Sequence, residues 1–152
     1  MKKSILILCR PAVAAILLGV VQPASAALIH RYSFASNAND SVGTAHGAAV
    51  STPNGAVPVF GGGRVELDGA GGYIDLPNGL FSSLTNVTIE AWVTVSANGN
   101  WARIFDFGTS TTGEVGPSQA IGTGIDYMFL THNVAGSVNA RFAITDDANG
   151  QE

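Results

Sequence analysis

Short runs of alternating apolar and polar residues, separated by clusters of Gly, Asn, Ser and Asp, constrain this chain more than any other feature. Beyond residue 26, no stretch repeats its apolar positions with a helical period. Successive side chains of a strand point to opposite faces, so alternation predicts strands that bury one face. The pattern therefore predicts an all-β fold of antiparallel sheets with glycine-rich turns.

The alternating runs predict strands at 28–35, 46–50, 57–60, 64–68, 73–76, 86–95, 101–107, 125–131 and 138–145. The clearest is 86–95, because its odd-numbered residues are all apolar. Glu90 and Trp92 are expected on its other face. After it, Asn98-Gly99 is a strong hairpin signal that predicts a return along 101–107.

The returning strand is expected to carry a mixed aromatic and basic face. By strict alternation, Trp101, Arg103, Phe105 and Phe107 share one side of it. The last two runs, 125–131 and 138–145, predict a further hairpin.

Residues 1–26 are identified as an export signal. Three basic residues precede an apolar run at 12–21, and an A-x-A cleavage pattern ends at Ala26. The apolar run is shorter than the roughly 20 residues that cross a bilayer, which excludes a membrane anchor. We therefore expect a cleaved signal peptide, a mature domain over 27–152, and a secreted or cell-surface location without membrane insertion.

Removal of the signal makes the chain acidic and leaves it without cysteine. The mature part keeps four arginines and no lysine against eleven acidic residues, a net charge of −7. A surface of that sign repels phosphate backbones, so nucleic acid is not an expected partner. Cys9 leaves with the signal, which excludes a disulfide, a cysteine nucleophile and a cysteine-ligated zinc.

Three stretches together resemble the laminin-G-like domains of the concanavalin A-like lectin/glucanase superfamily, in their secreted bacterial form. They are Leu28–Phe34 with Asn39-Asp40-Ser41, Val65–Gly69 with Gly72–Pro77, and Thr88-Ile89-Glu90-Ala91-Trp92-Val93. The resemblance implies a jelly-roll sandwich of two antiparallel sheets, one of them concave, that binds carbohydrate or a protein partner. Such domains usually continue through further strands, so the chain is expected to be incomplete at its C-terminus.

Glu66-Leu67-Asp68 raises the alternative of a glycoside hydrolase. Glucanases of this superfamily use Glu-x-Asp-x-x-Glu on one strand, but Gly71 occupies the place of the final Glu. A retaining mechanism needs paired carboxylates about 5–5.5 Å apart that flank the scissile bond, one of them a general acid. With the third acid missing, Glu66 and Asp68 are interpreted as polar residues at a strand end, and no catalytic residue is expected.

Four residues form the candidate ligand site: Glu90, Trp92, Trp101 and Arg103. If their sheet face is the concave one, the two indoles provide a surface for sugar stacking, with polar groups beside it. The structural alternative is that Glu90 pairs with Arg103 across the hairpin and Trp92 fills a secondary core.

Asp40 is the candidate calcium ligand, because the resemblance places it in a loop that often contributes to an ion site. Calcium takes 6–8 oxygen ligands, and Asp146-Asp147 is a second source of carboxylates. The alternative is an Asx-turn, in which Asp40 caps its own backbone. The sequence thus favours a secreted, non-catalytic module that binds a glycan or an extracellular protein. A relative of a glycoside hydrolase and a structural segment of a larger surface protein remain as alternatives.

Overall fold

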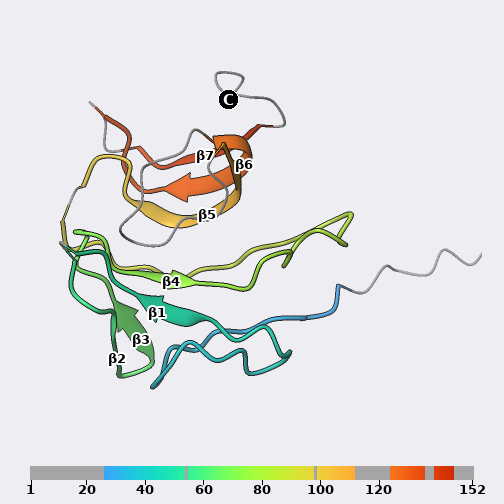
Figure 1. Ribbon diagram of the computed structural model, residues 1–152, viewed down its shortest axis with the longest axis horizontal. Helices are drawn as coiled ribbons and strands as arrows, with labels where there is room; N and C mark the ends of the chain where they lie inside the picture. The colour runs from blue at the N-terminus through green and yellow to red at the C-terminus, as the bar shows by residue number, and fades with distance from the viewer. Residues whose placement is uncertain (1–25, 54, 98, 112–123, 136–138, 146–152) are drawn as a thin grey trace, which may run out of the picture.

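The computed structural model describes residues 26–53, 55–97, 99–111, 124–135 and 139–145. All regular structure within these ranges is β, and every pair of strands is antiparallel (Figure 1). The all-β class predicted from the alternation is therefore confirmed. The described part contains no helix long and apolar enough to cross a bilayer.

Seven strands form three separate small sheets. They are β1 (Ala48–Val50), β2 (Val59–Gly61), β3 (Arg64–Glu66), β4 (Tyr73–Asp75), β5 (Arg103–Ser110), β6 (Gly124–Thr131) and β7 (Arg141–Thr145). β1 pairs with β4, β2 with β3, and the third sheet has the order β5-β6-β7. In Figure 1 this three-stranded sheet lies on one side of the molecule, and the two small pairs lie on the other.

The β2–β3 hairpin shows how the glycines shape the chain. Gly62 and Gly63 have φ angles of +60° and +76°. Two successive residues with positive φ give a turn whose twist matches that of the flanking strands. A side chain rarely adopts these angles, so the Gly-Gly pair fixes the register of this hairpin, in which Phe60 faces Val65.

The three-stranded sheet has an apolar face, made of Phe105 and Phe107 of β5, Met128 and Leu130 of β6, and Phe142 and Ile144 of β7. Residues directly opposite in the ladder share a side, so the pairing defines this set. Four of these six residues, all except Phe107 and Ile144, line a partly open hollow of about 320 Å³ together with Val87 and Ile89. The segment before β5 thus covers part of this face.

The opposite face of the sheet, here called the Trp101 face, carries Arg103, Asp106, Tyr127, Phe129, Thr131 and Arg141. Arg103 pairs with Thr131, whereas Phe105 pairs with the adjacent Leu130. Two residues of β5 therefore advance against one residue of β6, which is a β-bulge at Ile104. The prediction that Arg103 and Phe105 share a face is wrong, because the extra residue turns them to opposite sides.

Two predicted strands are not formed as expected. Among the described residues, 86–95 join no ladder, so the expected pairing of 86–95 with 101–107 is not formed. Instead, β5 pairs with β6, and the Trp101 N–H donates to the Asn133 carbonyl at 2.9 Å. The other is 28–35, which is reduced to a single bridge between Tyr32 and Asp40. Phe34 has a φ of +53°, and that angle ends the extended backbone.

The core of the described part is small. Its only buried hydrophobic residues are Ala38, Phe129 and Ala143, two of which face each other on β6 and β7. On the apolar face, Phe142 and Ile144 remain 57% and 63% exposed. Burial is therefore concentrated on the Trp101 face, around Phe129 and the buried Thr131.

Candidate ligand site around Trp101

Trp101 enters the site in a backbone conformation that large residues rarely adopt. Its φ is +59°, in the left-handed region, where strain of about 1–3 kcal/mol is typical. Hydrogen bonds on both sides hold it there, from the Trp101 N–H to the Asn133 carbonyl and from the Ala102 N–H to the Gly99 carbonyl. The indole is nevertheless 40% exposed. A strained, exposed aromatic residue on a fixed backbone is characteristic of a binding site rather than of a core.

A buried threonine supports the site from below. Thr131 has no exposed surface, and its hydroxyl lies 2.8 Å from the Ala102 carbonyl and 3.0 Å from the Asn133 carbonyl. The same residue pairs with Arg103 on β5 and with Arg141 on β7. Arg103 and Arg141 therefore lie on the same face of the sheet, one on each side of Thr131.

Both guanidinium groups approach the same indole ring. The guanidinium carbons of Arg103 and Arg141 lie 5.7 Å and 5.6 Å from the Trp101 ring centroid. Arg103 also stacks 3.8 Å above the ring centroid of Phe129. These distances are within the range of cation–π attraction, which fixes the planes of the arginines relative to the ring.

Arg103 is further positioned by two hydrogen bonds. Its Nε donates to Asp106 at 3.1 Å, and its Nη1 donates to the Trp101 carbonyl at 3.0 Å. A guanidinium has five N–H donors, so these two bonds orient the group and leave donors for a ligand.

Asn133 contributes a buried acceptor without a donor. Its side chain is 5% exposed, and its Nδ2 donates to the Asn100 Oδ1 at 3.4 Å, while its Oδ1 has no hydrogen-bond partner in the described part of the chain. The Nε2 of the neighbouring His132 is unpartnered in the same way. Leaving a buried polar atom unpaired costs free energy, and an ordered water is the usual partner of such atoms.

The structure unites only half of the predicted ligand site. Trp101 and Arg103 are together, but within the described residues no ring contact or ion pair joins Trp92 or Glu90 to them. Trp92 is 89% exposed, so it does not fill a secondary core. Among the described contacts, the ion pair of Arg103 is with Asp106, and none joins Arg103 to Glu90. The expected outward direction of Glu90 and Trp92 agrees with Val87 and Ile89 lining the hollow.

Phe129, Asn133 and Arg141 belong to the site but were not singled out from the sequence. Phe129 and Arg141 lie within the alternating runs at 125–131 and 138–145, and Asn133 follows the first of these runs. Nothing else in the sequence distinguishes them. Their convergence on Trp101 depends on the ladder register, which alternation does not specify.

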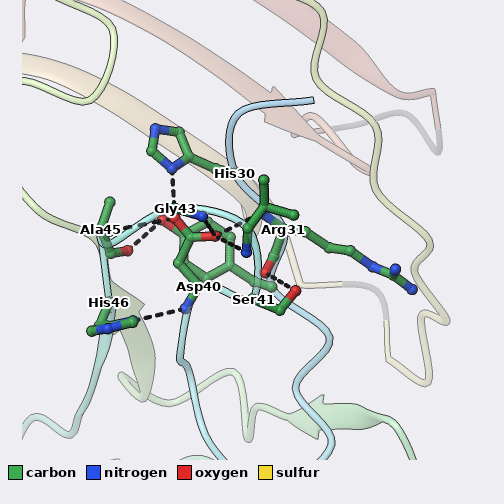
Figure 2. Close-up of polar contacts among 9 residues, drawn as sticks. His30, Arg31, Asp40, Ser41, Gly43, Ala45 and His46 are labelled. Atoms are coloured by element: carbon green, nitrogen blue, oxygen red, sulfur yellow. Dashed lines mark hydrogen bonds and ion pairs between the residues drawn. The ribbon is translucent and has the colours of Figure 1, made fainter. Parts of the chain in front are cut away.

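Asp40 forms a separate polar centre in the N-terminal segment (Figure 2). Its Oδ1 accepts the backbone N–H groups of Arg31, Val42 and Gly43, each at 3.0 Å. Its Oδ2 accepts the Nδ1 of His30 at 2.6 Å and the Ala45 N–H at 3.3 Å. One buried carboxylate thus ties together the whole stretch from 30 to 45.

These donors decide the ionisation of Asp40. Desolvation by burial acts to raise its pKa, but the hydrogen bonds from the Arg31 backbone, the His30 ring and the Gly43 backbone outweigh it. The pKa of the Asp40 carboxyl is therefore held well below its usual value.

The surroundings of Asp40 do not fit calcium. Calcium needs oxygen ligands, whereas five N–H donors point at this carboxylate. The described residues also contain no group of three His, Cys, Asp or Glu side chains able to hold a metal ion. Asp146 and Asp147 lie outside the described residues. The geometry supports the capping alternative for Asp40.

Glu66 and Asp68 are occupied by structural contacts. Glu66 pairs with Arg64 on the same strand at 2.6 Å. Asp68 accepts the N–H groups of Ala56 at 2.5 Å and Ala70 at 2.9 Å, and these bonds lower the pKa of its carboxyl. Both carboxylates therefore have the partners expected of polar residues at a strand end.

Comparison of the chain with models of known protein families, with curated proteins and with solved structures gives no match.

Proposed function

We propose that the mature chain is a secreted or cell-surface, non-catalytic binding module whose ligand is a carbohydrate. The observation that carries this proposal is the exposed indole of Trp101, held in a strained backbone conformation, with two guanidinium groups within 6 Å of its ring centroid. An aromatic face bordered by a few fixed polar groups suits a sugar. The C–H surface of the sugar ring stacks on the indole, and the sugar hydroxyls form hydrogen bonds with the polar groups.

The rigidity of the site supports the same function. Its floor is formed by Phe129 and Thr131, which are 2% and 0% exposed. Arg103 is held by a ring contact, an ion pair and a backbone carbonyl. A ligand therefore meets groups that are already ordered, and little conformational entropy is lost on binding.

We also propose that the three small sheets belong to a jelly-roll sandwich of the concanavalin A-like type, and that the domain is laminin-G-like. Support comes from the all-antiparallel pairing and from the motif stretches quoted above. The non-catalytic assignment is supported by the structural contacts of Glu66 and Asp68. The export signal supports the extracellular location.

The test is binding of the mature protein to a glycan array, followed by calorimetry on the best ligand. Trp101→Ala is expected to weaken binding at least tenfold, because it removes the stacking surface. Trp92→Ala is the matched control, since it removes an indole that is 89% exposed but lies outside the cluster. Thermal unfolding of both variants shows whether the fold is kept.

Absence of binding to any glycan would refute the carbohydrate assignment. Binding that is lost in Trp92→Ala and kept in Trp101→Ala would move the site to the segment before β5.

A further inference from the structure

We propose that residues 86–95 are an interaction surface for a second copy of this chain, with which they pair as antiparallel strands about a two-fold axis at Ala91. This inference goes beyond the proposed function, because it concerns a segment outside the Trp101 site. It follows from the unpaired backbone of the segment, from the exposure of its side chains and from the symmetry of its sequence.

The backbone of this segment is extended but unpaired. Residues 87–95 contain no turn or bend, and none of them has a positive φ. In Figure 1 they belong to the long yellow-green stretch that leads from β4 to β5. Within the described part of the chain, no backbone N–H or carbonyl of 86–95 takes part in a hydrogen bond. An extended row of such groups is a template for pairing with another strand.

The apolar side chains of the segment are also left open. Val87, Val93 and Val95 are each more than 40% exposed, and the Trp92 indole is 89% exposed. Neighbouring exposed apolar residues mark surfaces at which proteins meet. Covering them by a partner releases free energy in proportion to the apolar area that leaves water.

The sequence of the segment is complementary to itself. In an antiparallel pair with Ala91 on the axis, each residue before Ala91 lies opposite the residue that follows Ala91 by the same number of positions in the copy. The pairs are Ala91–Ala91, Ile89–Val93 and Val87–Val95 on one face, and Thr88–Thr94 and Glu90–Trp92 on the other. Opposed β-branched residues pack well, and opposed threonines can share a hydrogen bond. A two-fold interface requires a surface that matches itself in this way.

Neighbouring registers match less well. A shift of the copy by one residue sets apolar residues against polar ones, because the side-chain period of a strand is two. A shift by two residues in one direction puts Glu90 on the axis and brings two like charges directly opposite each other. The same shift in the other direction puts Trp92 on the axis and sets Val87 against Ala97 instead of Val95. The register centred on Ala91 therefore keeps the most apolar contact and separates the two charges.

The three-stranded sheet offers the copy an apolar surface to cover. Val87 and Ile89 line the partly open hollow on the apolar face of that sheet. Residues directly opposite in a ladder share a side, so the odd-numbered side chains of the copy point toward the same side as Val87 and Ile89. On that face, Phe142 and Ile144 are more than half exposed. The copy therefore extends an apolar layer that 86–95 forms only in part.

The charge of the segment permits the approach of two acidic chains. The mature chain has a net charge of −7, but Glu90 is the only charged residue between Asp75 and Arg103. Contact along 86–95 thus brings together one charge from each chain, and in the proposed register each Glu90 faces an indole. Like-charge repulsion is therefore weak at this surface.

The experiment measures the mass of the mature protein by sedimentation equilibrium over a range of concentrations. We expect a reversible dimer, whose average mass rises with concentration toward twice that of the monomer. A protein that stays monomeric at every concentration would overturn the inference.

Two substitutions at Trp92 test the register. Trp92→Glu places a carboxylate opposite Glu90 of the copy twice in each dimer, and it is expected to weaken dimerisation tenfold or more. Trp92→Lys removes the same indole but places an ammonium group opposite Glu90, so it is expected to dimerise at least tenfold more tightly than Trp92→Glu. Because position 92 is exposed, the fold of both variants is expected to be kept, which thermal unfolding checks.

Ser83→Glu and Ser83→Lys are the controls, because they make the charges of two exposed variants differ by the same amount outside the segment. They are expected to dimerise alike. A dimer that Trp92→Glu leaves unchanged, or that both substitutions at Trp92 weaken equally, would overturn the pairing along 86–95. A difference between the two Ser83 variants as large as that at Trp92 would do the same, because it would assign the effect to net charge.

Discussion

At the scale of single residues, the polar centre around Asp40 shows how one side chain organises a loop. Five N–H donors surround its carboxylate, four from the backbone and one from His30. Loops of this kind carry unpaired backbone groups that a short acidic side chain can satisfy. The Asp40 carboxylate therefore caps its own turn, as the sequence allowed, and also binds His30, ten positions upstream.

Gly43 allows the close packing around this carboxylate. A Cβ atom at this position would lie 2.6 Å from the Asp40 Oδ2 and 2.9 Å from the Ile29 carbonyl oxygen. Gly43→Ala is therefore expected to destabilise the protein by about 1–3 kcal/mol, as overpacking typically does. The measurement is chemical unfolding followed by circular dichroism.

Gly61→Ala is the matched control, because a Cβ there meets no atom within 4 Å. Its stability is expected to stay within about 0.5 kcal/mol of the wild type. Equal destabilisation by both substitutions would contradict the role of close approach at Gly43.

Calcium provides a second test at the same centre. Because N–H donors already occupy the Asp40 carboxylate, adding calcium or removing it with a chelator is expected to leave the melting temperature of the mature protein unchanged. A rise of several degrees with calcium that disappears in Asp40→Asn would show that the donor set rearranges around the ion.

At the scale of elements, the bulge at Ile104 decides the chemistry of the sheet. If Ile104 were paired in a regular ladder, alternation would place Arg103 on the side of Phe105, among the apolar side chains. The bulge turns Arg103 toward Thr131 and Phe129 instead. Because Ile104 has no partner in the ladder, Arg103 lies on the face opposite Phe105.

Deletion of Ile104 is expected to be tolerated for this reason. It makes this part of the β5–β6 ladder regular while Arg103 still faces Thr131 and Phe105 still faces Leu130. Deletion of Met128 is the control, because that residue pairs on both sides and its loss shifts both ladders by one position. We expect a cooperative thermal transition for the first variant and none for the second. Loss of the transition in both would contradict the assigned register.

At the scale of the whole molecule, the ionisation of Asp40 and Asp68 links stability to pH. Backbone N–H groups lower the pKa of Asp68, and the donors described above lower that of Asp40 against desolvation. In the unfolded chain an Asp has a pKa of about 3.9. A lowered folded pKa contributes stability above that value, and the contribution is lost as pH falls toward the folded pKa.

The melting temperature is therefore expected to hold from about pH 7 to pH 5 and to fall steeply below about pH 4. Asp40→Asn is expected to be less stable at pH 7 but to lose less on acidification, because one of the two linked carboxylates is gone. Thermal unfolding at a series of pH values measures this. Parallel pH profiles for the wild type and the variant would show that Asp40 does not contribute.

The sequence by itself determined the all-β class and the positions of most strands, because alternation is a local property written in consecutive residues. The hairpin of β6 with β7 and the polar role of Asp68 followed in the same way. Trp101 and Arg103 were recognisable as unusual residue types near one strand.

Only the tertiary structure decided which of these residues meet. The bulge at Ile104, the left-handed backbone of Trp101 and the pairing of Thr131 with two arginines depend on register between segments distant in sequence. The missing strand at 86–95 has the same cause, since an extended run becomes a strand only where a neighbour accepts its hydrogen bonds. Alternation fixes which way a side chain points relative to its neighbours in the chain, and only pairing fixes what it points toward.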